Sequence, residues 1–179
     1  MSTTTKNLWK IDPTHSEVQF KVKHLVISTV TGSFGSYDGK IEAEGDDFKN
    51  AKATFTADID SISTNNEDRD QHLKSDDFFN AGEYPQLTFE SNNFEKVGDG
   101  EYKVSGDLTI RDVTKQVELD VVHGGTVSDQ YGQTKAGFEA EGTLNRKEFG
   151  LTWDAVTEAG NVVVGDKIKL QLNGQFIKE

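Results

Sequence analysis

The chain has 179 residues, with 19 Lys and Arg against 31 Asp and Glu, which gives a formal net charge of −12. This negative surplus excludes the clustered cations that proteins need to bind nucleic acids, and it disfavours anionic membranes as well. The chain contains no cysteine, so disulfides, thiol catalysis and cysteine-ligated metal or iron–sulfur sites are excluded. Its length corresponds to about one domain.

Apolar residues recur at every second position in eight segments, and this alternation predicts strands with one buried and one exposed face. The segments are residues 17–24, 37–43, 53–59, 87–89, 102–110, 117–123, 136–144 and 168–176. Short glycine-rich stretches separate several of them, and no long helical pattern lies between them, which disfavours a parallel βαβ sheet. We therefore predict an antiparallel all-β fold. Closure into a barrel is favoured over an open sandwich because it removes exposed strand edges.

One stretch in the first half of the chain breaks the alternation. Thr64 begins a sequence with the spacing of a capping box, which predicts Thr64 as the N-cap of a helix over residues 65–74. Arg69, His72 and Leu73 would share one face of this helix. The helix has little apolar surface, so we expect it to dock on the barrel through Leu73 and the two phenylalanines that follow.

Nothing else divides the chain, so we expect residues 1–7 to be a flexible N-terminus and residues 8–179 to be a single domain. The first residues lack an apolar stretch of the length of a secretory signal. No later run approaches the roughly 20 apolar residues of a membrane-spanning helix. As written, the sequence predicts a cytoplasmic protein without membrane insertion. A periplasmic location applies if a signal peptide has been removed.

Candidate chemistry is sparse. His15, His24, His72 and His123 lie in four different segments and show no metal-binding spacing, although three histidines that met in the fold would form a site. The sequence has no Gly-x-Ser-x-Gly elbow and no phosphate-binding glycine loop. We therefore predict no catalytic residues and no metal site. His24 and His123 each end an apolar run, where a histidine either hydrogen-bonds the backbone or contacts a ligand head group.

The inward positions combine large and small side chains. The aromatic ones are Phe20, Phe55, Phe89, Phe138 and Phe176, and the small ones are Gly39, Ala43, Ala57, Gly106, Ala140 and Gly142. A packed core interleaves large and small residues in this way. Small residues near the middle of several strands also leave room in a barrel for a long apolar guest. Both interpretations are open at this point.

A series of residues with fixed order and spacing extends from residue 8 to residue 178. Its members include Trp9, Asp12, His15, Ser16, Gly32, Phe34, Ser61, Thr64, Arg69, Asp70, His72, Leu73, Phe78, Tyr84, Pro85, Gly106, Leu108, Arg146, Phe149, Gly150, Val164 and Asp166. This series resembles the YceI-like proteins over almost the whole chain. Its most specific part is the stretch from Ser61 to Pro85.

The resemblance implies an antiparallel eight-stranded, lipocalin-like β-barrel with a short helical excursion at about residues 64–80, found as a homodimer. Members of the family hold a long isoprenoid chain, a polyisoprenoid or an isoprenoid quinone, inside the barrel. The resemblance therefore implies non-catalytic lipid binding for carriage, storage or protection, with the lipid as ligand and no other cofactor. Two alternatives stay open: an enzyme acting on a lipophilic substrate in the same cavity, and a closed-core structural or interaction module.

We expect the ligand to contact inward apolar side chains and, at the open end of the barrel, three polar ones. The predicted ligand-binding residues are Val18, Phe20, Val22, His24, Phe55, Leu108, Phe138, Arg69 and His72. For Arg69 and His72 the alternative is a charge-assisted network that ties the helix to the barrel. Phe20→Ala and Phe138→Ala are expected to alter the bound lipid, whereas Arg69→Ala is expected mainly to lower the melting temperature.

Overall fold

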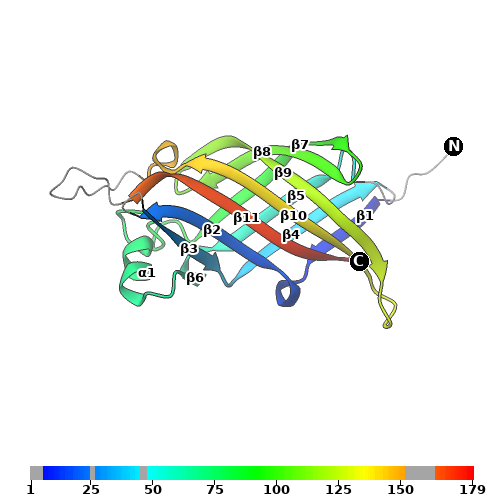
Figure 1. Cartoon of the computed structure of the whole chain (residues 1–179), viewed down its shortest axis with the longest axis horizontal. Helices are drawn as coiled ribbons and strands as arrows, with labels where there is room; N and C mark the ends of the chain where they lie inside the picture. Colours follow the sequence, from blue (N-terminus) through cyan, green and yellow to red (C-terminus); the bar gives the residue numbers. More distant parts are fainter. Residues whose placement is uncertain (1–5, 25–26, 45–47, 152–163) are drawn as a thin grey trace.

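A computed structural model describes residues 6–24, 27–44, 48–151 and 164–179 of the chain (Figure 1). The strands are β1 Lys6–Ile11, β2 Glu17–His24, β3 Ser28–Phe34, β4 Tyr37–Glu44, β5 Lys52–Asp58, β6 Ile62–Ser63, β7 Gln86–Gly98, β8 Glu101–Ile110, β9 Val113–Ser128, β10 Thr134–Asn145 and β11 Val164–Lys178. The helix is α1 Glu67–Lys74, and three 3₁₀ turns are η1 Pro13–His15, η2 Ile59–Ser61 and η3 Arg146–Phe149.

Eight strands form a closed antiparallel ring. Their hydrogen-bonded order is β1-β4-β5-β7-β8-β9-β10-β11, and β11 pairs again with β1, where Trp9 lies opposite Lys178. The predicted antiparallel eight-stranded barrel with one short helix is therefore confirmed. Lys6 and Asn7, which the sequence assigned to the flexible N-terminus, belong to β1. Residues 1–5 of that expected terminus lie outside the described residues, and the single domain stays a prediction.

The remaining strands β2, β3 and β6 continue β1, β4 and β5 beyond short interruptions. The interruptions lie side by side, because Gly35 N–H donates to Ser61 O at 3.1 Å and Asp58 N–H donates to Ser36 O at 2.9 Å. β1 and β3 were not among the predicted strands. β3 consists mostly of threonine, serine and glycine, so it has too little apolar alternation to be recognised as a strand from the sequence.

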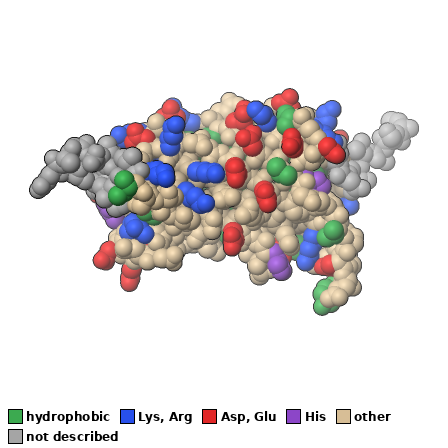
Figure 2. All heavy atoms as spheres, viewed as in Figure 1, with side chains coloured by type: hydrophobic (Ala, Val, Ile, Leu, Met, Phe, Trp, Pro, Cys, Tyr) green, Lys and Arg blue, Asp and Glu red, His purple; other side chains and the backbone are tan. Residues whose placement is uncertain are grey.

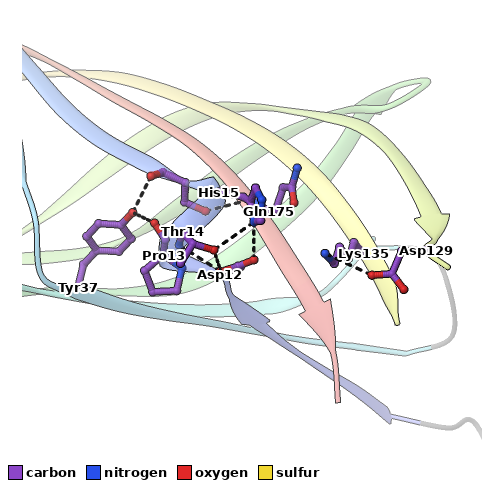
Figure 3. A network of polar contacts seen from close by, with 9 residues as sticks. Asp12, Pro13, Thr14, His15, Tyr37, Asp129, Lys135 and Gln175 are labelled. Carbon is purple, nitrogen blue, oxygen red and sulfur yellow. Dashed lines mark hydrogen bonds and ion pairs between the residues drawn. The ribbon is translucent and has the colours of Figure 1, made fainter. Parts of the chain in front are cut away.

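A polar network closes the first interruption, at η1 (Figure 3). The Oδ2 atom of Asp12 lies 2.8 Å from Nδ1 of His15. The Tyr37 hydroxyl donates to Ser16 O at 2.9 Å, and Gln175 N–H donates to the Ser16 hydroxyl at 3.0 Å. The hydrogen bond from His15 is the main cause that lowers the pKa of Asp12. These contacts fasten η1 to β4 and β11.

The helix α1 begins later than the sequence suggested. Asn66, rather than Thr64, is its N-cap, and its side chain accepts a hydrogen bond from Arg69 N at 3.0 Å. Asn65 adopts a left-handed φ of 61°, which turns the chain before the helix starts. Thr64 is buried and donates its hydroxyl to Oδ1 of Asp70 at 2.6 Å.

The two ends of the barrel differ in composition. The end that carries the β7–β8 and β9–β10 turns and the C-terminus, called the hairpin end below, contains a cluster with Trp9, Phe48 and Phe138. The opposite end carries α1 and η3 and is called the α1 end (Figure 1). Two clusters, around Phe149 and Phe34, fill it, and Leu73 and Phe79 pack against both.

On the face viewed in Figure 2, acidic and basic side chains are interspersed. Like charges also lie opposite each other across several ladders, for example Lys21 of β2 opposite Lys169 of β11 and Lys10 of β1 opposite Lys40 of β4. Within the described ranges, no helix combines the length and the apolar character needed to cross a bilayer.

Candidate ligand-binding cavity

A cavity of about 160 Å³ lies inside the barrel. Its aromatic lining consists of Phe34, Phe55, Phe89, Phe94, Phe138 and Phe176. Aliphatic residues complete most of the wall. The polar residues that border it, such as Gln19, Lys40 and Gln171, alternate along their strands with apolar neighbours, so their side chains belong to the outer face. The inner surface is therefore apolar.

The cavity follows the strands over a considerable length. It is bordered along β7 from Leu87 to Phe94 and along β11 from Leu170 to Phe176. At about 3.3 Å per residue these stretches extend for roughly 20 Å. A volume of about 160 Å³ spread over such a length is narrow, which suits a chain-like guest better than a compact ring system.

The small inward residues have two roles. Gly39 and Ala140 border the cavity. A Cβ added at Gly106, however, would lie 2.7 Å from Cζ of Phe89, and one at Gly142 would collide with Leu119. Gly106 therefore leaves room for the main chain of β7 as well as for the Phe89 ring, and Gly142 leaves room for Leu119, as in a packed core. The closed-core interpretation is thus right for part of the wall, while the centre of the barrel stays hollow.

Four of the predicted ligand-binding residues border the cavity: Val18, Phe55, Leu108 and Phe138. Phe20 and Val22 do not border the cavity in the part of the chain that the structure describes. The Phe20 ring instead packs against Gly32 and against Phe34, with ring centroids 5.7 Å apart. Strand alternation identified the inward face correctly at Phe20, but it does not reveal at which level of the barrel the interior is hollow.

Two of the three predicted polar residues, Arg69 and His72, lie apart from the cavity. Arg69 donates through Nε to the Thr64 hydroxyl at 2.8 Å and through Nη2 to Thr64 O at 2.7 Å. His72 Nε2 lies 2.9 Å from Oδ2 of Asp77. Arg69 therefore ties α1 to Thr64, the residue that follows β6, and His72 pairs with Asp77 just after the helix. The side chain of His24 lies outside the described part of the structure, so its predicted ligand contact stays a prediction.

Other lining residues were absent from the predicted site. They are mainly inward residues of two long strands, namely Val117, Leu119, Leu170 and Leu172. Each keeps some exposure although it faces the barrel interior, because its side chain borders open space. The alternation in residues 117–123 and 168–176 could have identified them, since it places all four on the inner face.

Two histidine–carboxylate pairs occur, His15 with Asp12 and His72 with Asp77, and neither histidine borders the cavity in the described structure. Tyr37, a titratable group with a shifted pKa, stacks on the cavity residue Phe55 with ring centroids 6.0 Å apart. Burial is the main cause that raises its pKa. In the described ranges, no cluster of three His, Asp or Glu side chains is placed to hold a metal ion.

Comparison with known proteins gives consistent results. A UPF0312 protein of Staphylococcus aureus strain N315 is 38% identical over 166 residues, which cover 92% of this chain and 94% of the relative. Among solved structures, Burkholderia cenocepacia BcnA superposes with a TM-score of 0.80 at 20% identity, covering 92% of this chain and 98% of BcnA. A polyisoprenoid binding domain from Saccharophagus degradans gives 0.65 at 15% identity, covering 97% and 98%.

The two structural likenesses show a shared barrel fold. The family follows from the sequence, because residues 9–176 match the YceI-like domain. That match covers nearly all of the closed barrel described above, including every strand that borders the cavity. The protein therefore belongs to the YceI-like family.

Proposed function

We propose that the protein binds a long-chain isoprenoid lipid, either a polyisoprenoid or an isoprenoid quinone, inside the barrel and without chemical change of the lipid. The observation that carries this proposal is the narrow apolar cavity, which extends along the strands between two packed ends. Membership of the YceI-like family and a fold shared with a polyisoprenoid binding domain support the same chemistry.

The driving force is the burial of apolar surface. A chain of about 40 carbons buried at roughly 25 cal/mol per Å² gains more than about 10 kcal/mol before the entropy costs of binding. No charged contact is required for that gain. A chain of this length needs more space than the free cavity offers, so lining side chains such as Phe138 and Leu172 must rotate as it enters.

The direct test is to purify the protein gently, extract it with organic solvent, and analyse the extract by mass spectrometry beside native mass spectrometry of the intact protein. We expect a stoichiometric isoprenoid species, and the native spectrum also tests the expected homodimer. A protein that carries no lipid and that also fails to bind added menaquinone-4 or geranylgeraniol would overturn the proposal.

A matched pair of variants locates the site. Ala140→Phe places a ring in the cavity, and Glu139→Phe places the same ring on the outer face of the same strand. We expect Ala140→Phe to weaken geranylgeraniol binding at least about tenfold, since it removes the space for the chain. Glu139→Phe should bind as the unmodified protein does. Equal affinities of the two variants would place the lipid elsewhere.

A further inference from the structure

A polar pocket lies at the hairpin end, next to the apolar cavity. In each of three neighbouring strands, one residue lines the cavity, and a residue two positions away, towards the hairpin end, lines the polar pocket. The pairs are Phe94 and Lys96 in β7, Val104 and Tyr102 in β8, and Val121 and His123 in β9. Residues two apart lie on the same face of a strand. The inner face therefore changes from apolar to polar along all three strands.

The strand register brings these polar residues together. Lys96 lies opposite Tyr102 across the β7–β8 ladder, and Tyr102 lies opposite Val121 across the β8–β9 ladder. The main chain of His123 donates to Gly100 O at 2.8 Å, which fastens β9 to the β7–β8 turn. The pocket is thus built on paired strands rather than on a free loop. The His123 side chain has a partner of its own there, because its Nε2 lies 2.9 Å from the Thr126 hydroxyl.

Aromatic rings form the partition between the cavity and the pocket. His123 stacks on the cavity residue Phe138 with ring centroids 5.0 Å apart and planes at 27°. Phe48 contacts both rings, at 5.1 Å and 4.8 Å, and Trp9 lies 5.4 Å from Phe48. A rotation of Phe138 or Phe48 would join the two spaces.

The same aromatic group contains a buried donor that lacks an acceptor. The indole Nε1–H of Trp9 has no hydrogen-bond partner in the described structure, and the residue is 1% exposed. A buried donor without an acceptor is destabilising, and such groups call for an explanation. An oxygen atom of a ligand that reaches this end of the barrel supplies one.

The chemistry of the pocket favours a neutral head group. Lys96 brings a cation, but Asp99 brings an anion to the same pocket, and the other side chains that line it are the phenol of Tyr102 and the imidazole of His123. A diphosphate would meet one lysine beside a carboxylate in a chain of net charge −12. A quinone carbonyl or a hydroxyl group requires only hydrogen-bonding partners.

We infer that the polar pocket at the hairpin end receives the neutral, oxygen-bearing head group of the lipid whose chain occupies the cavity. This inference rests on the proposed function and adds to it the position and the chemical class of the head group. The sequence-based site placed polar recognition at His24, Arg69 and His72, and it left a head-group contact of His123 open as one of two interpretations.

The test compares four probes with matched C20 chains: menaquinone-4, geranylgeraniol, geranylgeranyl diphosphate and the hydrocarbon phytane. Two variants each remove one hydrogen-bonding group with little change of shape. His123→Phe keeps a ring against Phe138, and Tyr102→Phe removes only the hydroxyl group. Tyr131→Phe is the matched control, because Tyr131 is 81% exposed in the β9–β10 turn. Affinities are measured by fluorescence titration and native mass spectrometry.

We expect His123→Phe and Tyr102→Phe each to lower the affinity for menaquinone-4 about fivefold, as the loss of one hydrogen bond does. The affinity for phytane should stay within about twofold of that of the unmodified protein. Tyr131→Phe should change neither affinity. The diphosphate should bind more weakly than menaquinone-4.

Three results would overturn the inference and leave the proposed function standing. The first is an unchanged ratio of menaquinone-4 to phytane affinity in both variants. The second is a loss of that ratio in His72→Phe instead, which would place the head group at the α1 end. The third is that geranylgeranyl diphosphate binds more tightly than the other three probes and loses this advantage in Lys96→Met. Failure of all four probes to bind, phytane included, would overturn the proposed function itself.

Discussion

The two ends of the barrel use their polar residues in different ways. At the α1 end, Arg69 and Asp70 both bind Thr64, and Arg146 donates to main-chain carbonyl groups. At the hairpin end, Lys96, Tyr102 and His123 line a pocket beside the cavity. Polar groups at the α1 end thus hold the chain to itself. At the hairpin end, His123 also bonds within the chain, because its Nε2 lies 2.9 Å from the Thr126 hydroxyl, but it lines a pocket that a ligand can enter as well.

This difference shows why a dense polar motif is a poor guide to a binding site. The stretch from Ser61 to Pro85 is the most specific part of the sequence pattern, yet its charged side chains bond to the protein itself. Arg69 and Asp70 bind Thr64, His72 pairs with Asp77, and Asp76 pairs with Arg111. α1 has no buried residue of its own, so it depends on such ties and on Leu73 to stay on the barrel. The first variants below therefore test stability and lipid affinity separately.

The largest effect is expected from Arg146→Met at the α1 end. Arg146 is 1% exposed and donates to Leu151 O at 2.7 Å and to Gly165 O at 2.9 Å. Loss of the guanidinium leaves these acceptors without their charged donor, which should lower the free energy of unfolding by about 3 kcal/mol. Urea unfolding monitored by circular dichroism measures the change.

Lysine at this position is the informative control. Arg146→Lys keeps the charge but loses the planar fork that reaches several carbonyl groups at once, so we expect only partial recovery of stability. Lipid affinity, measured at a temperature where both variants are folded, should equal that of the unmodified protein. A loss of less than about 1 kcal/mol in Arg146→Met would show that water replaces the guanidinium.

A smaller effect is expected from Arg69→Met, which removes both hydrogen bonds to Thr64. We expect the free energy of unfolding to fall by about 1–2 kcal/mol, and a double-mutant cycle with Thr64→Val to show coupling between the two residues. Menaquinone-4 affinity should stay unchanged. Weakened menaquinone-4 binding without a loss of stability would return Arg69 to the ligand site and remove the contrast between the two ends.

The sequence predicted the barrel because its period-2 alternation is local and extends over most strands. It also placed Val18, Phe55, Leu108 and Phe138 on the inner face, where they border the cavity. It could not separate Phe20 from Phe138, since the two have the same pattern and differ only in their neighbours. Phe20 covers Gly32 of the adjacent strand, whereas Phe138 faces open space. Such cross-strand contacts depend on register, which the spacing of apolar residues does not fix.

The polar pocket was also beyond reach from the sequence. His123 was noted as the end of an apolar run, but Lys96 and Tyr102 join it only through the pairing of β7, β8 and β9. Nothing in the spacing of these three residues along the chain connects them. The N-cap of α1 was misplaced for a related reason, because the left-handed turn at Asn65 is a local conformation that the capping-box spacing does not encode.

The smallest effect is expected from Asp12→Asn, in the wall of the barrel at η1. Hydrogen bonds from His15 and Thr14 lower the pKa of Asp12 below its ordinary value of 3.8. The ionised carboxylate therefore stabilises the folded protein at pH values above 3.8. This contribution is lost as the pH falls from 3.8 through the lower pKa of the folded state.

Asp12→Asn should therefore be less stable than the unmodified protein by about 1 kcal/mol at pH 6, and the difference should shrink as the pH falls below 3.8. Urea unfolding at a series of pH values measures it, with Glu42→Gln on the exposed face of β4 as a control for the loss of one negative charge. A difference that persists undiminished in acid would show that shape, rather than charge, makes Asp12 stabilising. In that case the network at η1 would stabilise this part of the wall without electrostatics, as the packed aromatic rings of the hairpin end do.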